Sequence, residues 1–150
     1  MNYKSDKELL FELCRFRSEV SDLTVFQNWI ASNYIRLQPK VSPGYLLKLR
    51  RGDKQQVMKI VTGLVPSCVN CRDICPEGAF LTREAFSQCA ASVAQRTRSG
   101  ALTPIGPPPW FKPDDKHFGA DSYFRCATCG AVWTLVLPER EDNGLWERLA

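Results

Sequence analysis

Histidine is nearly absent from this chain, since His117 is the only one among 150 residues. A single histidine excludes a pair of histidine metal ligands and the H-E-x-x-H motif, and no nucleophile–histidine triad is recognisable around it. His117 lies in "DDKHFGAD", beside Asp114 and Asp115, where a solvated loop histidine is expected and not a general base. A glycine-rich phosphate-binding loop is also absent. The sequence therefore predicts that the protein is not an enzyme.

Long apolar runs are absent as well. No window approaches the 18 apolar residues that a membrane-spanning helix needs. The opening "MNYKSDKELLFELCRF" contains acidic residues and lacks the apolar core of a signal peptide. We therefore expect a cytoplasmic protein with no membrane partner. Disulfides are rare in that reducing compartment, and seven cysteines cannot all pair. The cysteines are expected to be reduced and, where clustered, to bind metal.

Charge of one sign is not concentrated anywhere in the chain. The formal net charge is +4, and 20 Lys and Arg residues are interspersed with 16 Asp and Glu residues. Segments such as "KLRRGDKQQVMK" and "RTRSG" permit phosphate contacts without requiring them. Apolar residues make up 44% of the chain, which is enough for a hydrophobic core.

Residues 1–65 have the pattern of a compact helical unit. Apolar residues recur at helical spacing, and proline or glycine ends each pattern. Four helix starts are indicated by capping signals: a capping box from Ser5 to Glu8, Asp22, Ser42 before Pro43, and Asp53. We predict four short helices in this part of the chain.

The second half has a different character. Thr82 opens a predicted helix over 82–96, and the segment 100–122, with five prolines, is expected to be an extended loop. In "SYFRCATCGAVWTLVLP" the side chains alternate on both flanks of a central "CATCG". This alternation predicts a hairpin over 122–138 with two cysteines in its turn. The tail "EREDNGLWERLA" is expected to add a short helix.

Two Cys-x-x-Cys pairs, Cys68 with Cys71 and Cys126 with Cys129, carry the strongest chemical signal. Two intervening residues let both thiolates of a pair reach one tetrahedral Zn²⁺ at ~2.3 Å. Gly130 supports the second turn, because glycine tolerates a positive φ. The 54 residues between the pairs exceed the usual separation. A long loop nevertheless costs little more entropy to close than a short one. We predict one structural Zn²⁺ bound by all four cysteines.

Other uses of these cysteines fit less well. "CRDICPEGA" resembles the end of a ferredoxin cluster motif, but Val65 stands where its first cysteine belongs. The zinc deaminase pattern places a histidine before the cysteine pair, whereas His117 follows the first pair and has no glutamate two residues on. Neither pair lies in the βαβ context of a thiol redox motif.

Three cysteines lie outside the two pairs. Cys75 can substitute for one ligand or lie just outside the metal site. Cys89 lies on the apolar face of its predicted helix, and Cys14 follows Leu13 on the first helix. Free cysteines are commonly buried, so all three are expected to be non-ligating thiols packed as small apolar residues.

The two pairs, the second at a hairpin tip and followed by Gly130 and "AVW", resemble a zinc ribbon. The likeness covers the two knuckles and the hairpin. It implies a structural metal and no particular partner or activity. We therefore predict an α+β protein packed as one globule. Its parts are a helical unit over 1–65 and a zinc-ribbon-like unit over 66–150 with the inserted helix 82–96 and loop 100–122.

Without catalytic groups, the protein is expected to bind another protein. Trp110, Phe111 and Phe118 in the proline-rich loop are candidate anchors, because large rigid aromatics carry much of the energy of interfaces. Trp110 and Phe111 can equally pin the loop to its own core. The alternative is a zinc-ribbon protein that binds nucleic acid or is associated with transcription, since zinc ribbons often bind nucleic acid.

A second resemblance extends over more of the chain. The helical segment with "VFQNWI" and "GYLLKL", the first Cys-x-x-Cys pair and the terminal "RCATCG" hairpin are similar to small bacterial immunity-type proteins. This resemblance implies that the protein neutralises a cognate protein toxin by binding and occluding it. It implies no particular contact residues.

Overall fold

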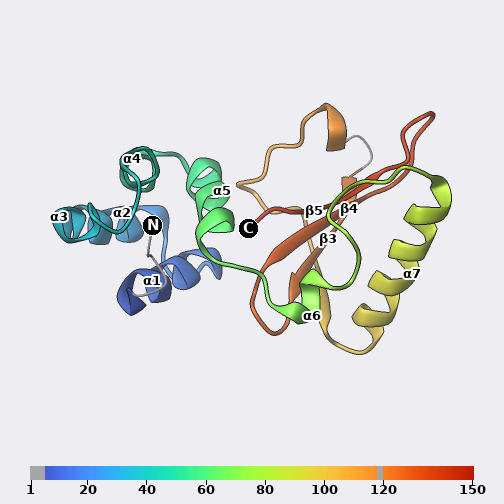
Figure 1. The fold of residues 1–150 in the computed structure, drawn as a ribbon, viewed down its shortest axis with the longest axis horizontal. Coiled ribbons are helices and arrows are strands. Elements are labelled where there is room, and N and C mark those ends of the chain that lie inside the picture. The colour runs from blue at the N-terminus through green and yellow to red at the C-terminus, as the bar shows by residue number, and fades with distance from the viewer. Residues whose placement is uncertain (1–5, 118–119) are drawn as a thin grey trace. The chain divides into compact units, whose positions relative to one another are not determined.

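The computed structural model describes residues 6–117 and 120–150. Over these residues the chain forms seven α-helices and a five-stranded antiparallel sheet, which confirms the predicted α+β class. The chain divides into two compact units, Met1–Pro66 and Ser67–Ala150 (Figure 1). Within the described ranges, every helix is too short or too polar to cross a lipid bilayer.

The first unit is helical, as its capping signals predict. Asp22 accepts a hydrogen bond from the amide of Val25, and Asp53 forms a capping box with Gln56. Pro43 stands at the start of its helix, where its missing N–H removes no hydrogen bond. Five helices form where four were predicted: α1 (Lys7–Arg17), α2 (Leu23–Ser32), the single turn α3 (Tyr34–Leu37), α4 (Pro43–Arg51) and α5 (Lys54–Leu64).

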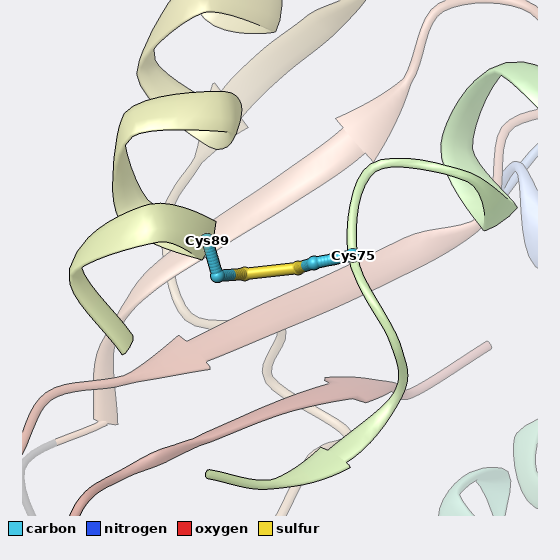
Figure 2. The surroundings of a disulfide bond; sticks show 2 residues. All are labelled: Cys75 and Cys89. Atoms are coloured by element: carbon cyan, nitrogen blue, oxygen red, sulfur yellow. A yellow bond between two sulfur atoms is a disulfide. The ribbon is translucent and has the colours of Figure 1, made fainter. Parts of the chain in front are cut away.

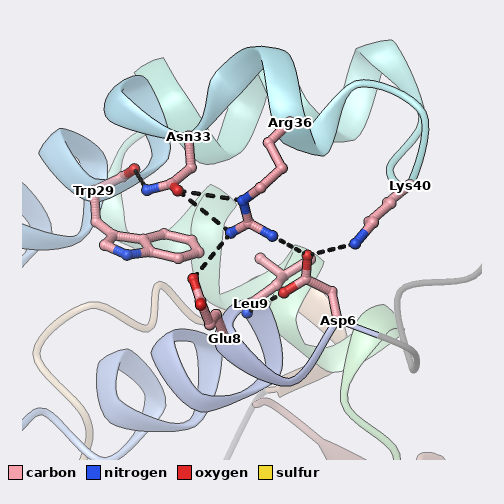
Figure 3. Close-up of polar contacts among 7 residues, drawn as sticks. All are labelled: Asp6, Glu8, Leu9, Trp29, Asn33, Arg36 and Lys40. Atoms are coloured by element: carbon pink, nitrogen blue, oxygen red, sulfur yellow. Dashed lines mark hydrogen bonds and ion pairs between the residues drawn. The ribbon is translucent and has the colours of Figure 1, made fainter.

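Asp6 is the N-cap of α1, whereas the predicted capping residue Ser5 lies outside the described residues. The Asp6 side chain is 2% exposed and accepts hydrogen bonds from the Leu9 amide at 2.9 Å, from Lys40 Nζ at 2.9 Å and from Arg36 (Figure 3). Burial raises the pKa of Asp6, but these donors and cations outweigh burial and hold the pKa below its usual value. The carboxylate thus ties the start of α1 to α3 and to the segment that follows it.

The second unit combines an antiparallel sheet with one long helix. The strand order in the sheet is β1-β5-β4-β3-β2. The predicted helix is α7, capped by Thr82, and the predicted hairpin is formed by β3 and β4. The elements are α6 (Val69–Arg72), β1 (Gly78–Ala79), α7 (Arg83–Arg98), β2 (Leu102–Ile105), the 3₁₀ turn η2 (Asp115–His117), β3 (Ala120–Cys126), β4 (Val132–Val136) and β5 (Leu145–Arg148).

Two expectations for this unit are wrong. The C-terminal tail forms strand β5, not a helix, because Trp146 pairs opposite Leu135 on the free edge that the β3–β4 hairpin offers. Gly144, at a φ of +82°, turns the chain into this strand. The proline-rich segment begins with strand β2, which pairs with β3. Pro104 is tolerated there because β2 is an edge strand.

One face of the sheet packs against α7. Trp133 of β4 and Trp146 of β5 stack with their ring centroids 4.9 Å apart. Cys89 and Val93 of α7 belong to the same buried cluster as these two indoles. Large aromatic side chains bury much apolar area, so this pair forms the centre of the unit's core.

The opposite face of the sheet is covered by the loop that follows β2. Tyr123, Thr134 and Glu147 lie side by side across β3, β4 and β5, on the face that alternates with the two indoles. Phe111 contacts Tyr123 edge-on, and His117 lies within hydrogen-bonding distance of Glu147. Both faces of the central strand β4 are therefore buried.

Candidate metal centre

The first cysteine pair lies at the start of a single helical turn. Cys68 has extended backbone and is the N-cap of α6, and Cys71 lies inside the turn and is fully buried. Residues three apart in a helical turn lie on the same side. The two sulfur atoms are accordingly 3.9 Å apart.

The second cysteine pair lies in the β3–β4 hairpin. Cys126 is the last residue of β3, and Cys129 lies in the turn that leads to β4. Gly130 has a φ of +80°, and its amide donates a hydrogen bond to the carbonyl of Cys126 at 2.9 Å. The predicted positive φ at Gly130 is confirmed, and it allows the turn to fold back immediately after Cys129.

The fold brings the two pairs together. Cys68 Sγ lies 3.6 Å from Cys126 Sγ, Cys71 Sγ lies 3.6 Å from Cys129 Sγ, and all four sulfurs lie within 4.8 Å of one another. These distances exceed the ~2.05 Å of a disulfide. A tetrahedral Zn²⁺ with bonds of ~2.3 Å separates its sulfur ligands by about 3.8 Å. The four thiols therefore have the spacing of ligands around one tetrahedral ion.

Hydrogen bonds near the sulfurs hold the two cysteine pairs next to each other. Asn70 Nδ2 donates to Thr128 Oγ1 at 3.2 Å, and Arg96 of α7 donates to the carbonyl of Asn70 at 3.1 Å. The amide of Ala127 donates to the carbonyl of Ala101, just before β2, at 3.0 Å. One continuous stretch of chain, from α7 into β2, thus supports both cysteine pairs.

The thiols alter one another's pKa. A hydrogen bond with Cys129 raises the pKa of Cys71 far above its usual value, and burial adds to this effect. The same bond lowers the pKa of Cys129 to about 4. Burial raises the pKa of Cys126. Without a cation the cluster thus favours a thiolate at Cys129, whereas a bound metal deprotonates the other thiols as well.

The donor set limits what the site can hold. Among the described residues, the cluster consists of four cysteine sulfurs, with Cys71 and Cys126 buried and Cys68 and Cys129 half-buried. Four thiolates suit Zn²⁺ or an iron–sulfur cluster. Four protein ligands around one tetrahedral ion also leave no open position for water or substrate. The arrangement can therefore bind a metal.

Cys75 and Cys89 form a disulfide, so the prediction that every cysteine is reduced is wrong (Figure 2). The bond joins the segment after α6 to α7, with a Cα–Cα distance of 5.7 Å. A disulfide sulfur is not a thiolate, and Cys75 in this state is therefore no substitute ligand. Cys89 is buried as predicted but is not free. The fold alone brings these two residues together, and their spacing along the chain carries no pairing signal. Cys14 is free and half-buried.

His117 is not the solvated loop residue that the sequence predicts. Its side chain is buried, with Nε2 3.0 Å from Glu147 Oε2, and Nδ1 accepts a hydrogen bond from the Asp114 amide at 3.1 Å. The ring of Phe111 meets the imidazole edge-on. His117 thus anchors the proline-rich loop to β5. The polar residues around it in the sequence give no sign of this role.

The structure describes two of the three residues that were predicted to anchor a partner protein. Trp110 is 8% exposed, and Phe111 is half-buried between Trp110, His117 and Tyr123. Phe111 thus contacts Tyr123 of β3, and little of the Trp110 side chain is left for a partner. Phe118 lies outside the described residues.

Comparisons with known proteins identify no relative. No family model matches the chain, no curated protein matches its sequence, and no solved structure matches its fold.

Proposed function

We propose that Cys68, Cys71, Cys126 and Cys129 bind one structural Zn²⁺ and that the protein is a non-catalytic, protein-binding protein. The observation that carries the metal assignment is the approach of all four sulfurs to within 4.8 Å of one another, at separations close to those of a tetrahedral ion. When bound, Zn²⁺ supplies a cross-link and no chemistry on a substrate, because its four positions are filled by protein.

The metal has a large role in the stability of the second unit. Structural Zn²⁺ can contribute on the order of 10 kcal/mol of apparent folding free energy, which is comparable to the whole stability of a typical domain. The first pair lies on a single helical turn, which is too short to be stable alone. The ion would fix this turn to the β3–β4 hairpin.

Metal analysis tests this assignment directly. Protein purified without chelator is expected to contain one zinc per chain, and Cys126→Ser is expected to contain none. Cys14→Ser is the matched control, because Cys14 is a free cysteine outside the cluster. Iron with visible charge-transfer absorption, in place of zinc, would refute the choice of metal. A wild-type protein that takes up neither metal would refute the site.

Binding to another protein is supported by the closed metal site and by apolar side chains left on the surface. Leu81, before α7, is 90% exposed, and Val69 of α6 is also exposed. Exposed apolar side chains on a folded surface can take part in a preformed interface. Neutralisation of a toxin by occlusion is the most specific form of this proposal, and it comes from the sequence resemblance alone.

The partner class is tested by two binding experiments. The wild-type protein is expected to form a salt-resistant complex with the product of a neighbouring toxin-like gene and to abolish its toxicity on co-expression. Leu81→Arg, which lies outside both cysteine pairs, is expected to keep its zinc and to weaken the complex. Binding to DNA or RNA that weakens steeply with salt would favour the nucleic-acid alternative.

A further inference from the structure

The Cys75–Cys89 disulfide lies at a groove beside the candidate metal centre. The groove has a volume of about 490 Å³ and is lined by both cysteines and by apolar side chains that include Ile74, Phe80 and Leu81. Cys75 is half-buried at this groove, whereas Cys89 is 2% exposed. A small dithiol can therefore reach the bond from the side of Cys75.

The same disulfide is joined to the metal ligands by short lengths of chain. Cys75 follows the ligand Cys71 by four residues, and Ile74 between them is buried in the same cluster as Cys71 and Cys89. On α7, Arg96 lies two turns after Cys89 and donates a hydrogen bond to the carbonyl of Asn70, inside the first Cys-x-x-Cys pair. Helix α7 is therefore joined to the segment after the first pair by the disulfide (Figure 2). It is joined to the first pair itself by the hydrogen bond from Arg96 to Asn70.

Helix α7 is linked to the second pair as well. The helix leads into β2, where Leu102 lies opposite the ligand Cys126. The carbonyl of Ala101 accepts the amide hydrogen of Ala127, between Cys126 and Cys129. A cross-link between the first pair and α7 thus restricts the distance between the two halves of the metal site before any metal binds.

From this placement we propose that Cys75–Cys89 is a reversible thiol–disulfide site whose oxidation state sets the metal affinity of the four-cysteine site. The proposal rests on the structural metal proposed above. With the disulfide formed, part of the ordering of residues 67–77 is complete before metal binds, so the metal binds more tightly. With the bond reduced, metal binding must supply that ordering itself. By linkage, bound metal must make the disulfide harder to reduce by the same factor.

The chemical step is exchange with a dithiol. One thiolate of the dithiol attacks Cys75 Sγ, the S–S bond breaks, and Cys89 leaves as a thiolate that takes up a proton. The second thiolate of the dithiol then displaces Cys75 and forms the disulfide of the oxidised reagent. Two electrons pass from the dithiol to the protein, and the two protons of the dithiol end on Cys75 and Cys89.

Zinc affinity, measured by competition with a chromophoric chelator, tests the coupling. Four full-length proteins are compared: oxidised wild type, wild type reduced and freed of dithiol anaerobically, the Cys75→Ser/Cys89→Ser double variant, and Cys14→Ser with its disulfide intact. Removal of the dithiol is essential because dithiols themselves bind zinc. Reduced wild type serves as a second measurement in case the double variant folds poorly.

We expect the reduced protein and the double variant to bind zinc about tenfold more weakly than oxidised wild type, with Cys14→Ser unchanged. At a saturating free zinc concentration held constant by a metal buffer, we also expect zinc to raise, by the same factor, the dithiol-to-disulfide ratio needed to reduce half of the protein. Affinities that agree within about twofold across all four proteins, or tighter binding after reduction, would overturn the coupling and leave the zinc site intact. Failure of every protein to bind zinc would overturn the coupling and the proposed metal site together.

Discussion

Asn70 and Thr128 occupy the same position in the two Cys-x-x-Cys pairs, and a hydrogen bond of 3.2 Å joins them. Each is the residue directly before the second cysteine of its pair. The two halves of the candidate metal site are therefore aligned by side chains that are not ligands. Contacts of this kind orient ligands around a metal and tune its affinity.

The Asn70–Thr128 contact can be measured by a double-mutant cycle. Asn70→Ala and Thr128→Val are each expected to lower the free energy of unfolding of the zinc-loaded protein by about 0.5–1 kcal/mol, because one exposed hydrogen bond is lost. The double variant is expected to cost less than the sum of the two single variants. Strictly additive losses in chemical denaturation would show that the two side chains do not interact.

Loss of a single ligand is expected to unfold the second unit. In Cys71→Ser, a thiolate at the centre of the cluster is replaced by a poor zinc ligand, so zinc is lost together with stabilisation on the order of 10 kcal/mol. Near-UV circular dichroism reports the result, because the stacked Trp133 and Trp146 lie in this unit. An unchanged tryptophan signal in zinc-free protein would mean that the sheet does not need the metal.

Asp6 makes the stability of the first unit dependent on pH. Its pKa is lower in the folded chain than in the unfolded chain, so its contribution is present above the unfolded pKa of ~3.9 and is lost as pH falls through the folded pKa. Asp6→Asn is expected to lower the free energy of unfolding by about 1–3 kcal/mol at pH 7, because it removes the charge that pairs with Arg36 and Lys40. The variant is also expected to lose less stability than wild type between pH 5 and pH 3. Parallel pH profiles for the two proteins would contradict this role.

Gly144 and Gly100 form a matched pair for testing the β4–β5 connection. Both have a φ near +80°, but a Cβ at position 144 would overlap the carbonyl oxygen of Val136, whereas a Cβ at position 100 would meet open space. Gly100→Ala is expected to cost about 1–2 kcal/mol of unfolding free energy, from backbone strain alone. Gly144→Ala is expected to cost distinctly more, because the strand pairing must shift as well. Equal melting temperatures for the two variants would contradict this difference.

Elements that depend on local signals were predictable from the sequence. Helix starts at Asp22 and Asp53 follow from side chains that hydrogen-bond to the amide three residues on. The hairpin and its cysteine turn follow from alternation and from Gly130. The four thiols were predicted to share one ion, and the structure brings them together.

Elements that depend on distant partners were not predictable in this way. Strand β5 was expected to be a helix, because the apolar residues of "LWERL" fit both the helical and the strand periodicity. The pairing of Trp146 with Leu135 in the sheet decides for the strand. The sequence around His117 predicts a solvated loop residue, whereas in the folded chain its side chain lies within hydrogen-bonding distance of Glu147 of β5. Phe111 likewise depends on a distant partner, because it contacts Tyr123 of β3.

The amino-acid sequence alone thus determined which cysteines can share a metal, because a pair spaced by two residues presents both sulfurs whatever surrounds it. Tertiary structure decided that Cys75 bonds to Cys89, since that pairing depends on α7 lying beside the segment after α6. Short-range geometry is encoded by neighbouring residues, whereas long-range contacts form only when the whole unit buries its core.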